Sequence, residues 1–247
     1  PRCGNKDPYK IGNLNGRLYC RECISFRLNK YIEYTPNKRR EIKPNLSYDL
    51  SFEQKEISKV LVKQFIKKKN SLVNAVCGAG KTEIVLEVIC YAISKGMRIA
   101  FAIPRRDVVI ELAERFRNIF PDLNVLAIYG GHIDKLEGDL LVLTTHQLFR
   151  YENYFDLIII DEIDAFPFAG SKMLMHQLKN SLRGNYIYLS ATPSDEIIKE
   201  FDGKENKIIK LYARFHHHPL PVPKIFRTLP PFNYFYLLYK VRQFVKA

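Results

Sequence analysis

Residues 75–82 read A-V-C-G-A-G-K-T, and this segment decides the fold. An apolar stretch at residues 71–76 leads into it, and a stretch with helical spacing at residues 81–94 follows it. The two glycines allow backbone N–H groups to turn inward around phosphate oxygens, and the following helix adds its positive dipole end. Lys81 supplies a charge for the β- and γ-phosphates, and the Thr82 hydroxyl is placed to ligate Mg²⁺. The segment therefore predicts a phosphate-binding loop between a strand and a helix.

The same strand–helix alternation continues along the chain. We expect strands at residues 71–76, 98–103, 124–128, 140–144, 156–160, 186–189 and 207–211. We expect helices at residues 52–69, 81–94, 107–119, 171–181, 194–201 and 232–244. Near-continuous apolar strands separated by helices predict an α/β fold, in which helices cover both faces of a parallel sheet. Ligands of such sheets bind beyond the carboxyl ends of the strands, where the phosphate-binding loop falls.

Two acidic residues follow the most apolar of these strands. Asp161 and Glu162 come directly after residues 157–160, which read L-I-I-I. We expect this strand end to lie beside the phosphate-binding loop, where Asp161 can hold Mg²⁺ through water. Glu162 can then orient or deprotonate the water that attacks the γ-phosphate. The alternative is that the two acids only solvate the end of a strand.

The sequence S-A-T at residues 190–192 ends the next apolar strand. The hydroxyls of Ser190 and Thr192 are placed to hydrogen-bond Asp164, which would connect the nucleotide state with the rest of the molecule. Taken alone, this tripeptide is common by chance and is a weak signal.

Three of the five cysteines lie near the N-terminus. Cys20 and Cys23 form a C-x-x-C pair, the spacing that suits a tetrahedral zinc site, and Cys3 precedes a glycine that permits a tight turn. A cysteine just before the first residue would supply the fourth ligand, so we expect a partial four-cysteine zinc module. The alternative is three free thiols in a disordered tail.

The chain carries a net charge of +13 that is unevenly distributed. Residues 1–69 hold 17 Lys and Arg against 7 Asp and Glu, whereas the remaining residues hold 22 against 19. A positive N-terminal part suits a polyanion, although the basic runs at residues 38–40 and 67–69 can equally be solvated faces. The sequence contains no apolar run of about 18 residues and no signal peptide, so we expect a cytoplasmic location.

The order of these motifs resembles that of superfamily-two helicases of the DEAD/DEAH and PriA-like type. Within them the chain is most similar to the late competence family ComFA. The similarity rests on the cysteine module, C-G-A-G-K-T-E at residues 77–83, D-E-I-D-A-F-P at 161–167 and L-P-V-P-K at 220–224. One departure is Ala75, which stands where the usual phosphate-binding loop has glycine; helicase-like motors tolerate alanine there.

The resemblance implies a RecA-like lobe that uses ATP, Mg²⁺ and Zn²⁺ to handle single-stranded DNA as it enters the cell during transformation. The implied partners are other DNA-uptake proteins at the inner face of the membrane, where the protein would be peripheral, and a second RecA-like lobe. The implied nucleotide contacts include Gln54 as the reader of the adenine edge, although Gln54 also completes a capping box with Ser51. The full set of expected nucleotide contacts is Gln54, Ala75, Cys77, Gly78, Ala79, Gly80, Lys81, Thr82, Glu83 and Asp161.

The resemblance also implies where such a motor grips a nucleic-acid backbone. The implied contacts are Arg105, Gly130, Gly131, Thr144, Thr145 and His146. Arg105 can equally be an ordinary charge at a helix start, and Thr145 can simply cap a short helix. Three histidines at residues 216–218 suggest a metal site, but we interpret them as a surface loop because consecutive side chains point in different directions.

We expect three parts in the chain. Residues 1–47 form the partial zinc module and a basic linker, and residues 48–213 form the first RecA-like lobe. Residues 214–247 form an extended Pro-rich segment and a helix that leads to an absent second lobe, because the remaining residues are too few for another lobe of roughly 150. Without the arginine finger of that lobe, which contributes about 10³–10⁵ in rate, we expect weak ATP hydrolysis.

Other functions remain open on the residues alone. The same lobe would serve an RNA helicase or a replication-restart helicase. A zinc-nucleated clamp that binds nucleic acid, with the ATP site as a switch, is the alternative outside the motor class.

Overall fold

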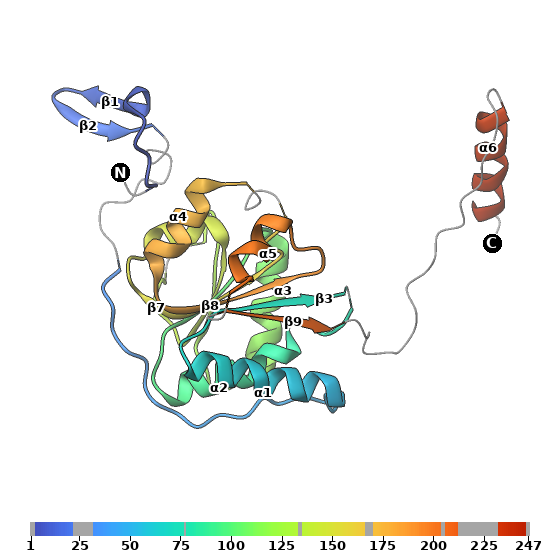
Figure 1. Ribbon diagram of the computed structural model, residues 1–247, viewed down its shortest axis with the longest axis horizontal. Helices are drawn as coiled ribbons and strands as arrows, with labels where there is room; N and C mark the ends of the chain where they lie inside the picture. Colours follow the sequence, from blue (N-terminus) through green and yellow to red (C-terminus); the bar gives the residue numbers. More distant parts are fainter. Residues whose placement is uncertain are drawn as a thin grey trace. The chain divides into compact units, whose positions relative to one another are not determined.

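The centre of the protein is a seven-stranded sheet in the order β5-β6-β4-β7-β8-β3-β9, in which every neighbouring pair is parallel. The computed structural model describes residues 3–21, 32–76, 78–132, 135–165, 170–203, 206–211 and 232–245 (Figure 1). The strands of this sheet are β3 (Ser71–Ala75), β4 (Ile99–Ile103), β5 (Val125–Ile128), β6 (Leu140–Thr144), β7 (Phe155–Asp161), β8 (Leu182–Ser190) and β9 (Lys207–Leu211). The predicted parallel α/β sheet is confirmed.

Helices cover both faces of the sheet. One face carries α1 (Phe52–Ile66), α2 (Leu86–Ser94) and α3 (Arg106–Ile119), and the other carries α4 (Lys172–Ser181), α5 (Asp195–Phe201) and the 3₁₀ helix η4 (Thr145–Arg150). Figure 1 shows α1 and α2 below the sheet and α4 and α5 above it. Serine side chains at positions 51, 171 and 194 cap α1, α4 and α5 by accepting a backbone N–H bond, which fixes where these helices begin.

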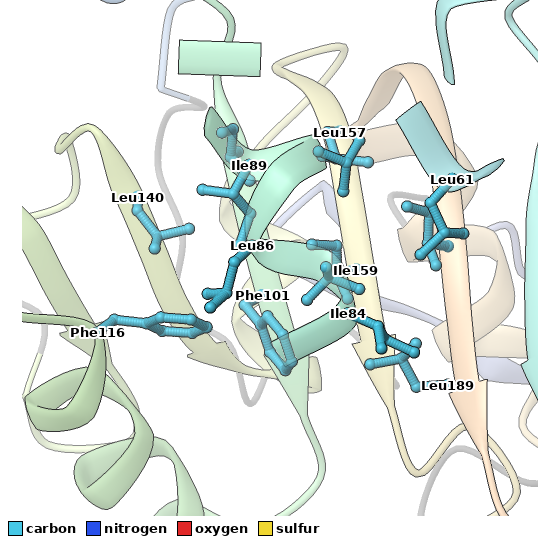
Figure 2. Close-up of a cluster of buried hydrophobic side chains, with 14 of the residues drawn as sticks. Leu61, Ile84, Leu86, Ile89, Phe101, Phe116, Leu140, Leu157, Ile159 and Leu189 are labelled. Carbon is cyan, nitrogen blue, oxygen red and sulfur yellow. The ribbon is translucent and has the colours of Figure 1, made fainter. Parts of the chain in front are cut away.

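Alternate side chains of the strands enter two separate hydrophobic clusters. On the α1–α3 face, Phe101 and Ile159 from β4 and β7 pack with Leu61 of α1, and all three side chains are fully buried (Figure 2). On the α4–α5 face, Ile158 and Ile160 pack with Leu178. Burial on both faces explains why the strands read as near-continuous apolar runs.

Two helix boundaries differ from those expected. The helix expected at residues 81–94 begins as the 3₁₀ turn η3 (Glu83–Val85) and becomes regular only in α2, and such tighter turns are frequent at helix starts. α1 ends at Ile66 instead of residue 69, because Lys68 adopts a left-handed backbone with φ of 54° that a helix cannot continue through.

One strand is longer than expected. β8 begins at Leu182, not at residue 186, because Leu182 pairs with Phe155 of β7 across a register shift. The intervening residues Arg183, Gly184 and Asn185 are not apolar, so the hydrophobicity pattern does not predict a strand there. Backbone pairing with β7 forms the strand instead.

A strap at residues 32–50 runs over the lobe and is fixed to it by polar contacts. The Asn37 side chain donates to the Met97 and Asp139 carbonyl oxygens at 2.8 and 2.9 Å, and Arg40 Nη2 donates to both carboxylate oxygens of Asp139 at 2.9 and 3.0 Å. Part of the positive charge of the N-terminal region is therefore paired with acidic groups of the protein itself.

Two further elements complete the described chain. A hairpin of β1 (Ile11–Leu14) and β2 (Arg17–Cys20) follows the short 3₁₀ helix η1 (Pro8–Lys10). The helix α6 (Phe232–Val245) belongs to a separate compact unit, His216–Ala247, and the remainder forms the unit Pro1–Phe215. Among the residues that the structure describes, no helix is long and apolar enough to cross a membrane.

Candidate active site

The carboxyl ends of three neighbouring strands bring the predicted catalytic groups to one rim of the sheet. In the sheet order β7-β8-β3, Asn74 of β3 pairs with Ser190 of β8, and Asp161 of β7 pairs with Leu189. The phosphate-binding loop, the acidic pair and the S-A-T segment therefore follow strands that end side by side.

The phosphate-binding loop has the backbone that the sequence predicts. Gly78 and Gly80 adopt φ of 80° and 77°, values that residues other than glycine rarely adopt. Gly78 is exposed, and the space where a side chain would stand is empty, which leaves room for a phosphate to approach the backbone. Ala75 is fully buried at the end of β3, so a small residue suits that position. Cys77 lies outside the described residues.

Gln54 is tied to this loop from α1. Its side-chain nitrogen donates to the Ala79 carbonyl oxygen at 2.9 Å, and its oxygen accepts from the Ser51 backbone N–H at 2.9 Å. A side chain added at Gly80 would collide with the Gln54 amide, which shows how closely α1 approaches the loop. The capping box is thus present, and the reading of adenine by Gln54 stays a prediction.

Asp161, the first acid at the end of β7, lies within electrostatic reach of Lys81. Burial raises the pKa of Asp161, and the Lys81 ammonium acts in the opposite direction by favouring the charged carboxylate. Glu162 has a left-handed backbone with φ of 55°, and its N–H donates to Asp161 Oδ1 at 3.0 Å. A glutamate in this conformation is strained, and such strain is characteristic of functional sites.

Asp164 joins the acidic turn to β8. Ser190 Oγ donates to Asp164 Oδ1 at 2.6 Å, and Thr192 Oγ1 donates to Asp164 Oδ2 at 2.7 Å. Both hydrogen bonds expected from the sequence are therefore present, and they fix the position of the turn that carries Asp161 and Glu162. The coupling role of these bonds stays a prediction.

Glu83 belongs to a polar cluster that the sequence did not reveal. Its buried carboxylate accepts a hydrogen bond from Tyr48 Oη at 2.7 Å and pairs with Arg115 of α3. Because Glu83 directly follows Thr82, this cluster anchors the end of the phosphate-binding loop to α3 and to the strap. An arginine within an amphipathic helix carries no sequence signal for such a contact.

The residues expected to contact nucleic acid follow β4, β5 and β6, which are also neighbours in the sheet. Arg105 and the two glycines at 130 and 131 are exposed. Thr144 and Thr145 are buried, and Thr145 Oγ1 has no hydrogen-bond partner among the residues that the structure describes. Burial lowers the pKa of the half-buried His146. The predicted contacts stay predictions, and the full burial of Thr145 leaves it without an exposed surface for a nucleic-acid strand.

The structure does not supply the predicted four-cysteine site. The Cys3 and Cys20 sulfurs lie 3.5 Å apart. Within the described residues, however, no group of three or more His, Cys, Asp or Glu side chains could hold a metal ion. Cys23, the three histidines at 216–218 and the segments 166–169 and 212–231 lie outside the described residues.

Comparison with known proteins decides the family. Residues 54–201 match the family described as DEAD/DEAH box helicase, which covers more than half of the chain and includes every catalytic group named above. The chain belongs to the DEAD/DEAH box helicase family. It therefore carries a domain of the helicase type.

Two curated relatives of this chain share one name. The chain is 36% identical over 237 residues to "Competence protein ComFA" of Bacillus subtilis (strain 168), which corresponds to 90% of this chain and 51% of that protein. It is 37% identical over 216 residues to "Competence protein ComFA" of Streptococcus pneumoniae (strain ATCC BAA-255 / R6), at 85% and 50% coverage. The chain therefore spans about half the length of the curated relatives it matches.

A solved structure supports the fold. A "hypothetical ATP-dependent RNA helicase from Sulfolobus tokodaii" aligns with a TM-score of 0.51 and 22% identity, covering 66% of this chain and 53% of that chain. At this identity the likeness shows a shared RecA-like fold and nothing of the substrate.

Proposed function

We propose that this chain is the ATP-binding part of a motor that is stimulated by single-stranded DNA and acts in DNA uptake. The observation that carries the proposal is that the loop with Lys81 and the acidic pair follow strands that end side by side at one rim, where Lys81 acts electrostatically on Asp161. A triphosphate bound at the loop would meet a cation and two carboxylates there, as phosphoryl transfer requires.

Each group has a separate task in this proposal. The loop N–H groups and Lys81 bind the β- and γ-phosphates, while Thr82 and Asp161 hold Mg²⁺, Asp161 through water. Glu162 orients or deprotonates the attacking water. The bound metal would neutralise charge on the transferring phosphoryl group.

The rim divides into two neighbouring halves. The nucleotide groups follow β7, β8 and β3, whereas the proposed strand contacts follow β5, β6 and β4. Arg105 follows β4, the strand that lies beside β7 in the sheet, and its side chain donates to Asp107. A nucleic-acid strand bound at Arg105 would therefore lie at the border of the nucleotide half, which would give a route for stimulation.

The choice of DNA and of DNA uptake rests on the two relatives that are named competence protein. The partners we propose are single-stranded DNA, other competence proteins at the inner face of the membrane, and a second RecA-like lobe. We also propose a cytoplasmic location and the division at residues 47 and 213. Because an arginine finger from another lobe contributes about 10³–10⁵ in rate, we expect this chain alone to hydrolyse ATP slowly.

Single-stranded DNA is expected to stimulate ATP hydrolysis by the full-length protein. The measurement is steady-state phosphate release with single-stranded DNA, duplex DNA or single-stranded RNA, at several salt concentrations because phosphate contacts weaken with salt. Stimulation by RNA alone would favour an RNA helicase. Strand binding without any stimulation would favour the clamp that uses ATP as a switch, and would contradict the motor.

We also propose that the N-terminal cysteines bind zinc. Zn–S bonds of about 2.3 Å in a tetrahedral site place two sulfurs about 3.8 Å apart, and the 3.5 Å between Cys3 and Cys20 is close to this value. Both thiols are buried, as structural zinc ligands are. Cys23 would be a third ligand by its C-x-x-C spacing.

Purified full-length protein is expected to contain about one zinc per chain, and Cys20→Ser is expected to lose most of it because a structural site needs its full ligand set. Metal analysis of both proteins measures this, with Ser47→Ala, an exposed position in the strap, as the control. Wild-type protein without zinc, or equal zinc in the Cys20→Ser variant, would contradict the site.

A further inference from the structure

A tight turn at the end of β5 and the first residue of α3 bring together three side chains that are not among the predicted nucleic-acid contacts. Tyr129 and His132 exchange backbone hydrogen bonds of 3.3 and 3.0 Å across the two glycines between them. Their rings are stacked, with centroids 5.0 Å apart and planes inclined by 18°. The Arg106 guanidinium of α3 lies 4.7 Å from the Tyr129 ring centroid.

The stack is packed against the protein on the Tyr129 side and exposed to solvent on the His132 side. Tyr129 is half-buried against the α1–α3 cluster, which holds its ring in place, whereas His132 and Arg106 are exposed. Within the described part of the chain Arg106 has no ion pair, in contrast to Arg105, which pairs with Asp107. The positive charge of Arg106 is thus available to an anion.

The space beside the stack is also free. Side chains added at Gly130 or Gly131 would meet no heavy atom of the described residues within 4 Å, so a ligand backbone can approach the turn closely. Gly131 has φ of 83°, which only glycine adopts without strain, so the turn geometry and the open approach depend on the same residue.

This combination suits a nucleobase and not a bare phosphate. A flat exposed ring offers stacking that every base can use, an arginine beside it adds charge for the backbone, and such platforms are typical of proteins that hold single strands. A phosphate has no planar face, so it would not stack on the two rings.

We propose that His132, backed by Tyr129 and Arg106, stacks on a base of single-stranded nucleic acid whose backbone passes Gly130 and Gly131. The proposal rests on the proposed function, since it names residues by which the motor would hold its strand. It adds base stacking, which tolerates any sequence, to the backbone contacts expected at this rim.

The chain has no tryptophan, so one introduced at the turn is a direct reporter. His132→Trp is expected to lose fluorescence when oligothymidylate binds and to keep it with an abasic strand of equal length and charge, because only a base can stack on the indole. Ile66→Trp is the control: this half-exposed residue ends α1 and lines a hollow with Asp156 near the amino end of β7, away from the rim. No quenching at position 132, or equal quenching by the abasic strand, would overturn the proposal.

Affinity gives a second test. His132→Ala is expected to weaken binding of oligothymidylate about 5- to 150-fold, the range for one stacked base, while His132→Phe retains binding and ATP affinity stays unchanged in both. The stacking role would be overturned if His132→Ala bound oligothymidylate as tightly as wild type, or if His132→Phe lost as much affinity as His132→Ala. In either case strand binding by the wild-type chain would leave the motor proposal standing. Absence of strand binding by the wild-type chain would instead remove the proposed function together with this inference.

Discussion

Glu162→Gln is expected to lower the rate of ATP hydrolysis by the full-length protein about 10²- to 10⁴-fold, the range that a general base contributes. The amide keeps the size of the side chain and its place in the strained turn after β7, but it cannot accept a proton or orient water as a carboxylate does. ATP affinity is expected to stay within a few-fold of wild type, because the phosphates are bound by the loop and Lys81.

The measurement compares single-turnover hydrolysis with binding of a fluorescent ATP analogue. Glu111→Gln is the matched control, since Glu111 is an exposed residue of α3 away from β7. An active Glu162→Gln variant would show that another group activates the water. A variant that no longer binds the analogue would show that Glu162 serves nucleotide binding or folding instead.

Lys81→Ala is expected to weaken ATP binding about 10- to 150-fold and to lower hydrolysis by at least about 10²-fold. A hydrogen bond to a charged group contributes about 1.5–3 kcal/mol in the bound state, and a preorganised charge contributes more as negative charge moves in the transition state. Lys63→Ala, which removes an exposed lysine of α1, is the control.

The two variants separate the two halves of the site. Lys81→Ala should lose binding and hydrolysis together, whereas Glu162→Gln should lose hydrolysis with binding retained. Normal ATP affinity in Lys81→Ala, measured with the same analogue, would mean that the nucleotide is held elsewhere. Circular dichroism of each variant checks that the sheet is intact.

The strands that carry the site were predictable because buried strands have a recognisable apolar sequence pattern. The expected strand 140–144 matches β6 residue for residue, since all five of its side chains are buried. The expected strand 207–211 likewise matches β9, although Lys207 and Lys210 are exposed there. The loop glycines and the Asp164 hydrogen bonds were predictable for a related reason: short motifs at adjacent strand ends meet at one rim.

Contacts between segments far apart in the chain were not predictable. No periodicity pairs Tyr48 with Arg115, or places both on Glu83, because the pairing depends on how the strap crosses the lobe. Nor did the sequence predict the burial of Thr145, which follows from the packing of η4 beneath the sheet rim. The Arg106 stack likewise depends on the angle at which α3 leaves β4.

A crystal structure of the Glu162→Gln variant with ATP and Mg²⁺ tests the central claim most directly. We predict the Lys81 ammonium in contact with the β- and γ-phosphate oxygens, Thr82 on the metal, Asp161 bound to a water of that metal, and residue 162 facing the γ-phosphate. A triphosphate bound away from the loop, or a metal with no link to Asp161, would contradict the account.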